Sequence, residues 1–261
     1  MTMITSPHNE RVKLVRLLQS RSKARRQHNR LALEGVRLVR DALDSGSRPD
    51  FILYDAAAAQ PGTPAADLIA RAQAEGIACW QVSEALMREM ADTETPQGVL
   101  GVFPLPDLPL PPSPGLALVV DGWRDPGNLG AVIRTAAAAG VDLVVLTPGT
   151  VDPFNPKSLR AGMGGHFRVP IRTLDWPQVI DRLPGMAVYL ADAAGDTLYT
   201  AVDWTRPSML VVGGEAHGFS RAAAQIPHTR IRIPMTPGSE SLNAAISASI
   251  LIYEARRHTF F

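Results

Sequence analysis

The chain has 261 residues, of which 46% are hydrophobic and 20% are charged, and its formal net charge is +1. This composition excludes an intrinsically disordered protein, and the single cysteine, Cys79, excludes both an internal disulfide and a zinc site built from several thiolates. No apolar run approaches the roughly 18 residues that span a bilayer and no signal-peptide core is present, so we expect a cytoplasmic protein that does not contact a membrane.

The first hundred residues are expected to form a small α/β domain. Ser83 is the expected N-cap of its last helix. Its predicted helices span 10–20, 31–45, 64–75 and 83–90, and its predicted strands span 50–54 and 78–81.

Residues 11–30 are strongly basic and contain no acidic side chain. A block of one sign marks either a solvated helix face or a surface that binds nucleic-acid phosphates, and the lack of balancing carboxylates favours the second. The side chains that we expect to contact RNA are Arg11, Lys13, Arg21, Lys23, Arg25 and Arg26.

A proline-rich stretch from Phe103 to Gly115 is the clearest domain boundary in the chain. Proline at this density does not join a helix or a central strand, and it favours an extended spacer. We therefore predict a first domain at 1–103, a linker at 104–114 and a second domain at 115–261.

The second domain alternates strands and helices. Its predicted strands are 116–121, 141–147, 168–171, 187–191, 209–212 and 230–234, with helices at 128–139 and at 241 to about 257, and others between the strands. Residues 116–120 are apolar throughout, as is typical of a parallel strand buried on both faces. This alternation predicts a mostly parallel sheet that binds ligands outside the carboxyl ends of its strands.

Three segments carry candidate chemistry, and each begins where a predicted strand of the second domain ends. The first runs from Asp121 to Arg134, and in it Asn128 could cap a new helix. The alternative is an ordinary strand-to-helix loop with a surface arginine.

The second segment, 211–220, places Gly213, Gly214 and Glu215 after an apolar strand, where the glycines free backbone groups for a ligand. The alternative is a tight turn with a solvated glutamate. The third segment, 233–243, is a loop followed by a helix expected to start at Ser241, with Asn243 in its first turn; such a start suits a ligand's carboxylate or hydroxyls.

Several nucleotide-binding signatures are absent from the sequence. There is no Gly-x-x-x-x-Gly-Lys-Ser/Thr loop, and the glycines of 125–130 do not match Gly-x-Gly-x-x-Gly. The histidines show no metal-ligand spacing, so we expect no catalytic metal.

Taken together, the three segments resemble the three motifs of the SpoU/TrmH family of SPOUT RNA methyltransferases, in the family's order. Segment 157–170 also looks like the family's intervening region, except that Gly162 stands where a serine is expected. Segments 4–13 and 33–39 resemble the substrate-binding domain of members that methylate ribosomal RNA, a domain similar to ribosomal protein L30e.

The resemblance implies an S-adenosylmethionine-dependent RNA 2′-O-ribose methyltransferase, with ribosomal RNA favoured as substrate. It also implies a deep C-terminal trefoil knot and a homodimer with active sites near the interface. Arg134 would be the catalytic residue, and Asn128, Glu215, Ser241 and Asn243 would shape the pocket around it. The implied cofactor-binding residues are Gly213, Gly214, Glu215, Ile233, Met235, Ser241, Leu242 and Asn243.

Other functions remain open at the level of the sequence. They are a transfer-RNA 2′-O-methyltransferase, an RNA-binding module of the same fold that has lost catalysis, and an unrelated α/β enzyme with a nucleotide cofactor. The silent module is disfavoured by four intact residues, namely Asn128, Arg134, Glu215 and Asn243. The missing phosphate-loop signatures argue against the unrelated enzyme.

Overall fold

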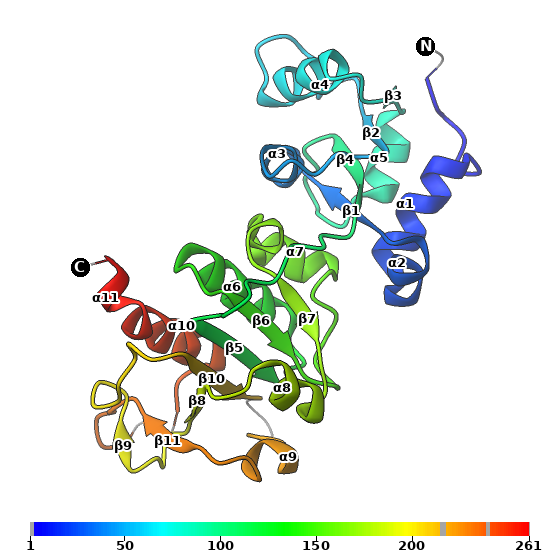
Figure 1. Ribbon diagram of the computed structural model, residues 1–261. Coiled ribbons are helices and arrows are strands. Elements are labelled where there is room, and N and C mark those ends of the chain that lie inside the picture. Colours follow the sequence, from blue (N-terminus) through cyan, green and yellow to red (C-terminus); the bar gives the residue numbers. More distant parts are fainter. Residues whose placement is uncertain (1–2, 215–217, 239–240, 261) are drawn as a thin grey trace. The chain divides into compact units, whose positions relative to one another are not determined.

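The computed structural model describes residues 3–214, 218–238 and 241–260, and the chain divides into two compact units (Figure 1). Unit 1 comprises Met1–Pro106 and Phe154–Phe167, and unit 2 comprises Asp107–Pro153 and Arg168–Phe261. The first division falls inside the proline-rich stretch, whereas 154–167, which the sequence assigned to the second domain, packs with unit 1. Among the described residues, no helix has the length and apolar character needed to cross a membrane.

Unit 1 is built on a mixed four-stranded sheet with the strand order β1-β4-β2-β3. Its strands are β1 (Arg30–Glu34), β2 (Phe51–Tyr54), β3 (Cys79–Gln81) and β4 (Val99–Pro104). Its helices are α1 (Glu10–Ser20), α2 (Ser22–His28), α3 (Val36–Asp44), α4 (Pro64–Ala74), α5 (Glu84–Met90) and α7 (Pro156–Gly162), followed by the short 3-10 turn η1 (Gly165–Phe167).

The helix predicted at 31–45 was wrong in its first part, which is strand β1. Leu31 and Leu33 enter a core with α3 and α4, while Ala32 faces a second core with α1 and α5. β1 pairs antiparallel with β4, a strand that the sequence did not predict. Gly35, with φ of 95°, ends β1 and allows α3 to begin at Val36.

The short helix α2 was also missed, and it changes the role of one predicted RNA-binding residue. Arg25 is only 3% exposed, and its guanidinium donates to the backbone carbonyls of Leu18 and Gln19, near the C-terminus of α1. It satisfies helix carbonyls that lack intrahelical donors. Arg25 is therefore a buried structural residue and not part of an exposed RNA-binding surface.

Unit 2 contains a seven-stranded parallel sheet with the order β7-β6-β5-β10-β8-β11-β9. This confirms the predicted parallel α/β architecture. The strands are β5 (Leu116–Asp121), β6 (Leu143–Leu146), β7 (Ile171–Thr173), β8 (Ala187–Ala191), β9 (Thr197–Leu198), β10 (Ser208–Gly213) and β11 (Thr229–Arg232). β7 lies three residues beyond the predicted start at 168, and the two-residue β9 was not predicted.

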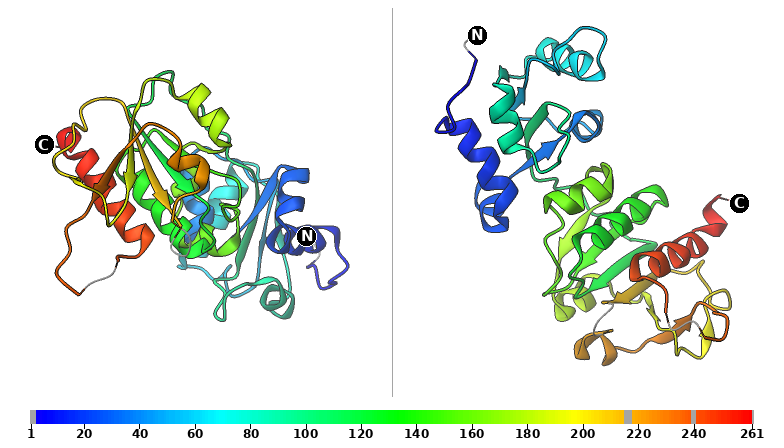
Figure 2. Two further views of the ribbon diagram at one scale, coloured as in Figure 1. Left: turned by 90° about the horizontal axis from the view of Figure 1, so that it is seen from below. Right: turned by 180° about the vertical axis from the view of Figure 1, so that it is seen from behind.

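The helices of unit 2 cover both faces of this sheet (Figures 1 and 2). They are α6 (Pro126–Ala138), α8 (Trp176–Arg182), α9 (Arg221–Ala224), α10 (Ala244–Ala255) and α11 (Arg257–Phe260). α6 and α10 pack against each other over one face, and α8 and α9 contribute to the core on the other.

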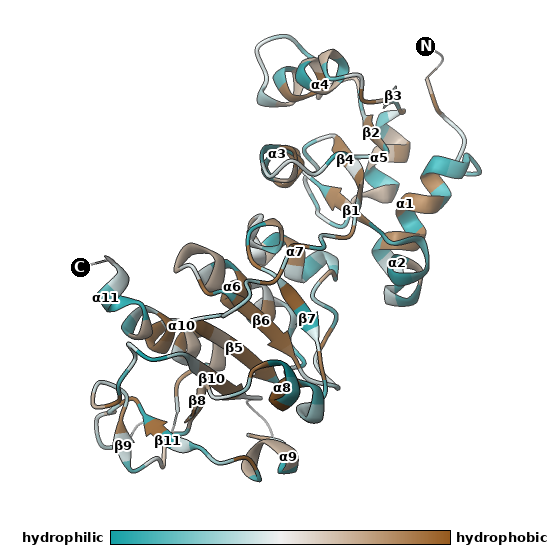
Figure 3. Ribbon diagram, in the orientation of Figure 1, coloured by the Kyte–Doolittle hydropathy of each residue, from teal (hydrophilic) through white to brown (hydrophobic). Residues whose placement is uncertain are grey.

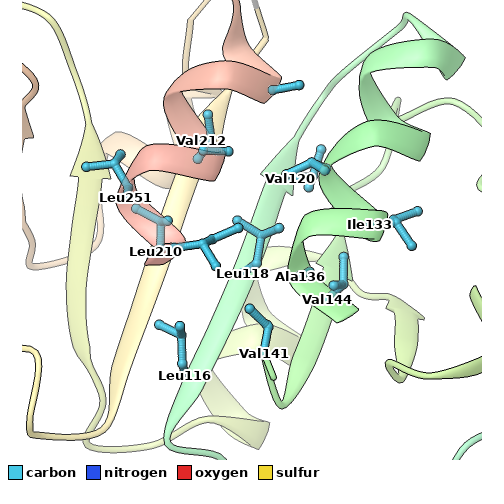
Figure 4. Packing of buried hydrophobic residues seen from close by; sticks show 14 of the residues in the cluster. Leu116, Leu118, Val120, Ile133, Ala136, Val141, Val144, Leu210, Val212 and Leu251 are labelled. Atoms are coloured by element: carbon cyan, nitrogen blue, oxygen red, sulfur yellow. The ribbon is translucent and has the colours of Figure 1, made fainter. Parts of the chain in front are cut away.

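The side chains of β5 alternate between the two cores, and this explains the uninterrupted apolar run of its first five residues, 116–120. Leu116, Leu118 and Val120 pack in the core of α6 and α10 (Figure 4). Ala117 and Val119 lie in the opposite core, which includes residues of α8 and α9. A strand buried on both faces has no polar side, and β5, β6 and β10 are accordingly among the most apolar segments in Figure 3.

Candidate active site

Two neighbouring pockets lie at the carboxyl ends of the strands of unit 2, where the sequence predicted a ligand site. The first, here called the β5–β6 pocket, has a volume of about 420 Å³ and lies beyond β6, β5 and β10. The second, the β8–β11 pocket, has a volume of about 280 Å³ and lies beyond β10, β8 and β11. Both are lined by Gly214, Gly218, Phe219 and Ala244.

The first segment forms the entrance to α6. Asp125, not Asn128, is the N-cap of this helix, because its Oδ1 accepts the backbone N–H of Asn128 at 2.7 Å. Pro126 takes the first helical position, which needs no N–H donor. Asn128 is thereby left in the first turn, where it lines the β5–β6 pocket.

The third segment meets the first through a side-chain hydrogen bond. α10 begins at Ala244 and not at Ser241, because Asn243 is its N-cap: its Oδ1 accepts the N–H groups of Ala245 (2.9 Å) and Ile246 (3.2 Å). The Asn243 amide nitrogen donates to Asn128 Oδ1 at 3.2 Å. The two segments, more than a hundred residues apart, are therefore joined at the start of α6 and of α10.

The second segment folds back on itself at the end of β10. Gly214 N–H donates to Gly218 O (3.0 Å), and Gly218 N–H donates to Gly214 O (2.8 Å). A Cβ on Gly213 would lie 2.5 Å from the carbonyl carbon of Gly218, so only glycine fits beside this paired backbone. The backbone at Gly214 forms part of both pockets.

Buried polar groups fix the floor of the β5–β6 pocket. The Asp121 carboxylate, 3% exposed, accepts the Thr147 hydroxyl at Oδ1 and the Ser220 backbone N–H at Oδ2, both at 2.7 Å. The Trp123 indole N–H donates to the carbonyls of Val212 (3.0 Å) and Gly213 (2.9 Å). These bonds tie the ends of β5, β6 and β10 together.

Asp192, which sequence reasoning missed, lies in the wall of the β8–β11 pocket. Its Oδ2 accepts two bonds from Arg230, at 2.9 and 2.6 Å, and its Oδ1 accepts the N–H of Ala194 at 2.8 Å. The residue directly follows β8. The rule that ligands bind at the carboxyl ends of parallel strands pointed to this position and to Pro148 after β6.

The structure brings most of the predicted site residues to these two pockets. Gly213, Gly214, Ile233, Met235, Ser241 and Leu242 all line the β8–β11 pocket. Arg134 is exposed on α6 and lines neither pocket. Glu215 lies outside the described residues.

The predicted RNA-binding side chains of unit 1 differ in what they contact. The Arg11 guanidinium lies 4.2 Å from the ring centre of Trp80, and Lys13 pairs with Glu10 at 2.9 Å. Arg21, Lys23 and Arg26 are exposed at α2. We call these last three residues the α2 basic surface. No cluster that could hold a metal ion occurs among the residues with described positions.

A comparison with known families matches residues 115–253 to the SpoU rRNA Methylase family and residues 9–101 to the MRM3-like substrate binding domain. The first match covers more than half of the chain and all three segments that meet at the pockets. The chain belongs to the SpoU rRNA methylase family. The structure places the three segments that resemble the family's motifs along one edge of the parallel sheet of unit 2.

Named relatives and a solved structure match over nearly the whole chain. The 23S rRNA (guanosine(2553)-2′-O)-methyltransferase RlmP of Bacillus subtilis is 35% identical, with 98% of this chain and 100% of the relative covered. The human mitochondrial rRNA methyltransferase 3 is 32% identical over 96% of this chain and 73% of its own length. The crystal structure of an AdoMet-bound rRNA methyltransferase from Sinorhizobium meliloti superposes with a TM-score of 0.85, at 33% identity and 98% coverage of both chains.

Proposed function

We propose that this protein transfers a methyl group from S-adenosylmethionine to the 2′-hydroxyl of a ribose in ribosomal RNA. The observation that carries the proposal is the meeting of two pockets at Gly214, beside the hydrogen bond that joins Asn128 and Asn243. A two-substrate transfer needs two adjacent sites, because holding both reactants in place removes much of the entropic barrier. The B. subtilis relative is named as an enzyme of this class.

The β8–β11 pocket fits the cofactor. Ile233 and Leu251 offer apolar surface for an adenine, and the absent side chain of Gly213 lets a ligand approach the backbone closely. Asp192 and Ser241 provide oxygen atoms at the wall. When bound, the cofactor supplies an activated methyl group on a sulfonium, so the protein's task is to orient and activate the ribose hydroxyl.

Arg134 is proposed to act on the RNA rather than on the cofactor. A guanidinium keeps its protons in proteins, so it is suited to hold a phosphate and to stabilise the charge that develops on the 2′-oxygen. Asn128 and Asn243 would hold the start of α6 and the start of α10 in register, with Ser241 and Glu215 shaping the cofactor side. Because Asn128 lines the β5–β6 pocket, it would touch the ribose from that wall.

The function is tested by incubating the protein with methyl-labelled S-adenosylmethionine and total RNA, followed by alkaline hydrolysis. We expect an alkali-resistant labelled dinucleotide from ribosomal RNA, because a 2′-O-methyl group blocks cleavage of the adjacent phosphodiester. If the label is confined to transfer RNA, the substrate is transfer RNA and not ribosomal RNA. Cofactor binding without label in naked RNA or in ribosomal assembly intermediates would favour a catalytically silent RNA-binding module.

We further propose that unit 1 binds RNA through the α2 basic surface. Replacing Arg21, Lys23 and Arg26 together with alanine should weaken RNA binding and reduce the slope of log affinity against log salt by about 0.7–0.9 for each phosphate that is no longer neutralised. Filter binding between low and moderate salt measures this slope. Arg88→Ala is the matched control, because Arg88 is an exposed cation of unit 1 that pairs with Glu84. An unchanged slope in the triple variant would contradict the assignment.

Arg25 provides the opposite expectation within the same basic block. Arg25→Met should leave the salt slope unchanged but destabilise unit 1 by about 2 kcal/mol, because it removes charge-assisted hydrogen bonds to Leu18 and Gln19. Thermal or urea unfolding followed by circular dichroism measures the decrease in stability. If the variant is as stable as the wild type but binds RNA more weakly, Arg25 is an RNA-binding residue and not a structural one.

A homodimer is proposed through the exposed face of α10. Leu242, Ile246 and Tyr253 are 39%, 54% and 50% exposed, and their spacing places them on one side of the helix and its entry. α10 packs beside α6, where Thr135 and Ser249 share a 3.0 Å hydrogen bond. A dimer across this face would bring Arg134, which lines neither pocket of its own chain, towards the partner's site.

Ile246→Lys is expected to convert the dimer to a monomer, because a charge at the centre of an apolar interface is left without a partner. Size-exclusion chromatography with light scattering measures the mass. Ile180→Lys on α8 is the matched control, since Ile180 is 52% exposed in the same unit. A dimer in the Ile246 variant, or a monomeric wild type, would refute this interface.

The trefoil knot and the cytoplasmic location are proposed together with this function. The knot is supported by the place of β10 between β5 and β8, and by α10 packed against both α6 and β10. The location is supported by the proposed ribosomal RNA substrate and by the single cysteine, Cys79, which forms no internal disulfide.

A further inference from the structure

The β5–β6 pocket is larger than the β8–β11 pocket proposed for the cofactor. Most of the residues assigned to the cofactor do not line it. Of the residues predicted from the sequence, Asn128 and Gly214 line it. Its volume of about 420 Å³ lies within the range of small-molecule sites. The pocket therefore has room for a second ligand next to the methyl donor.

The position of this pocket restricts the ligand to something attached to the methyl acceptor. It shares Gly214, Gly218, Phe219 and Ala244 with the β8–β11 pocket, so a group bound in one lies directly beside a group bound in the other. The acceptor is a ribose hydroxyl, and two parts of a nucleotide flank the ribose: the phosphate and the base. Arg134 is already assigned to the phosphate, which leaves the base.

The lining of the pocket suits the flat, largely apolar faces of a base. Phe219 and Pro148 provide ring surfaces, and the buried Trp123 forms part of the floor. Arg124 and Asp125 are exposed at the rim and can offer hydrogen bonds to the edge of a base. Proteins that recognise single-stranded RNA combine aromatic stacking with hydrogen bonds to base edges in this way.

The pocket is also preformed. The Asp121 carboxylate, with its hydrogen bonds to Thr147 and Ser220, fixes the end of β6 and the backbone after Phe219. The indole of Trp123 is held by two carbonyls at the end of β10. A preformed pocket loses little entropy when it orders its ligand, which favours selective binding of a base that has left its stack.

We infer that the β5–β6 pocket receives the unstacked base of the nucleotide whose ribose is methylated, an inference that rests on the proposed methyltransferase function. The base anchors the nucleotide on one side of the ribose while Arg134 holds the phosphate on the other. The 2′-hydroxyl is thereby aimed at Gly214, where the two pockets meet. The β5–β6 pocket then selects the base at the modified position, and other surfaces of the protein bind the surrounding RNA.

The test uses the full chain and two synthetic RNA hairpins that contain the nucleotide mapped by the labelling experiment. One hairpin is natural, and the other carries an abasic ribose with an intact 2′-hydroxyl at the target position. For the wild type, we expect kcat/KM to fall by about 10-fold or more on the abasic RNA, because this RNA has no base to stack in the pocket or to hydrogen-bond at its rim.

Two pocket variants make the test specific. Pro148→Ala and Arg124→Ala, each of which lines only the β5–β6 pocket, should lower kcat/KM on the natural RNA by roughly 5-fold or more and leave the abasic RNA almost unaffected. Met235→Ala is the matched control, because Met235 lines only the β8–β11 pocket. It should raise KM for S-adenosylmethionine and slow both RNAs equally.

The outcomes separate this inference from the proposed function. If the wild type methylates both hairpins equally well, the inference is overturned and the methyltransferase function stands. The inference is also overturned if removing the base lowers kcat/KM by the same factor in the wild type and in both pocket variants, because the base is then recognised outside this pocket. If no RNA is methylated by a wild type that binds S-adenosylmethionine, the proposed function itself fails.

Discussion

Replacing Arg134 with alanine is expected to lower the rate of RNA methylation by about 100- to 1,000-fold while the affinity for S-adenosylmethionine is retained. Arg134 is exposed on α6 and lines neither pocket, so its removal leaves the cofactor site intact. The rate falls because a fixed positive charge no longer stabilises the phosphate and the developing charge on the ribose oxygen. Single-turnover methyl transfer and calorimetric titration with S-adenosylmethionine measure the two quantities separately.

Two further variants sharpen this prediction. Arg134→Lys keeps the charge but not the planar fork of donors, so its rate should lie between those of wild type and alanine variant. Arg182→Ala removes an exposed arginine of α8 in the same unit and should leave the rate unchanged. Parallel loss of cofactor binding and activity in Arg134→Ala would contradict the proposed role, as would an unchanged rate.

The location of the candidate site could be predicted from the sequence because it depends on a general property of parallel sheets. The segments after β5 and β10 were recognised from apolar runs followed by glycine and polar residues, and carboxyl ends of parallel strands share one edge. The order of the strands could not be predicted in the same way. That β10 lies between β5 and β8 is decided by tertiary packing, and this order is what creates two pockets rather than one.

The errors within unit 1 have a common physical cause. Leu31, Ala32 and Leu33 are all buried, on opposite faces of a strand, so no two-residue alternation of apolar and polar side chains marked β1. Its partner β4 overlaps the start of the proline-rich stretch at Phe103 and Pro104, and it contains Gly101, which lowers strand propensity. Gly35 was the local signal for the break, because its positive φ separates strand from helix.

The helix starts in unit 2 were displaced because neighbouring polar residues compete for the capping position. Asp125 and Asn128 are both good N-caps, as are Ser241 and Asn243. The choice depends on which side chain reaches the free N–H groups, and this is fixed by backbone geometry. Because Asn128 lies in the first turn of α6, its side chain accepts the hydrogen bond from Asn243 that joins the two segments of the site.

The basic block shows the limit of charge patterns. The sequence of residues 11–30 reveals how many cations are present but not where each guanidinium points. Arg25 is directed into unit 1, Arg11 lies over Trp80, and Lys13 pairs with a carboxylate. The predicted RNA-binding residues therefore include the α2 basic surface. A charge pattern alone does not separate this surface from neighbouring cations that make contacts within the protein.

Gly213→Ala is expected to weaken S-adenosylmethionine binding by about 10-fold or more, which corresponds to about 1.4 kcal/mol. The added Cβ would lie 2.5 Å from the carbonyl carbon of Gly218 and 2.8 Å from the amide nitrogen of Phe219, and both neighbours are backbone atoms that cannot rotate away. The paired backbone of Gly214 and Gly218 must therefore shift, and with it the wall common to both pockets. Calorimetric titration measures the decrease in affinity.

The same substitution should also lower the free energy of unfolding, by about 1–3 kcal/mol, because it overpacks a tight backbone contact. Gly115→Ala is the matched control: its φ is not positive, it lines neither pocket, and its Cβ would meet only side-chain atoms, the nearest being the Asp142 carboxylate at 3.4 Å. If both alanine variants bind S-adenosylmethionine as the wild type does, the close approach at Gly213 does not shape the cofactor pocket. If only Gly213→Ala loses affinity while remaining folded, the bare backbone at the end of β10 is required for binding.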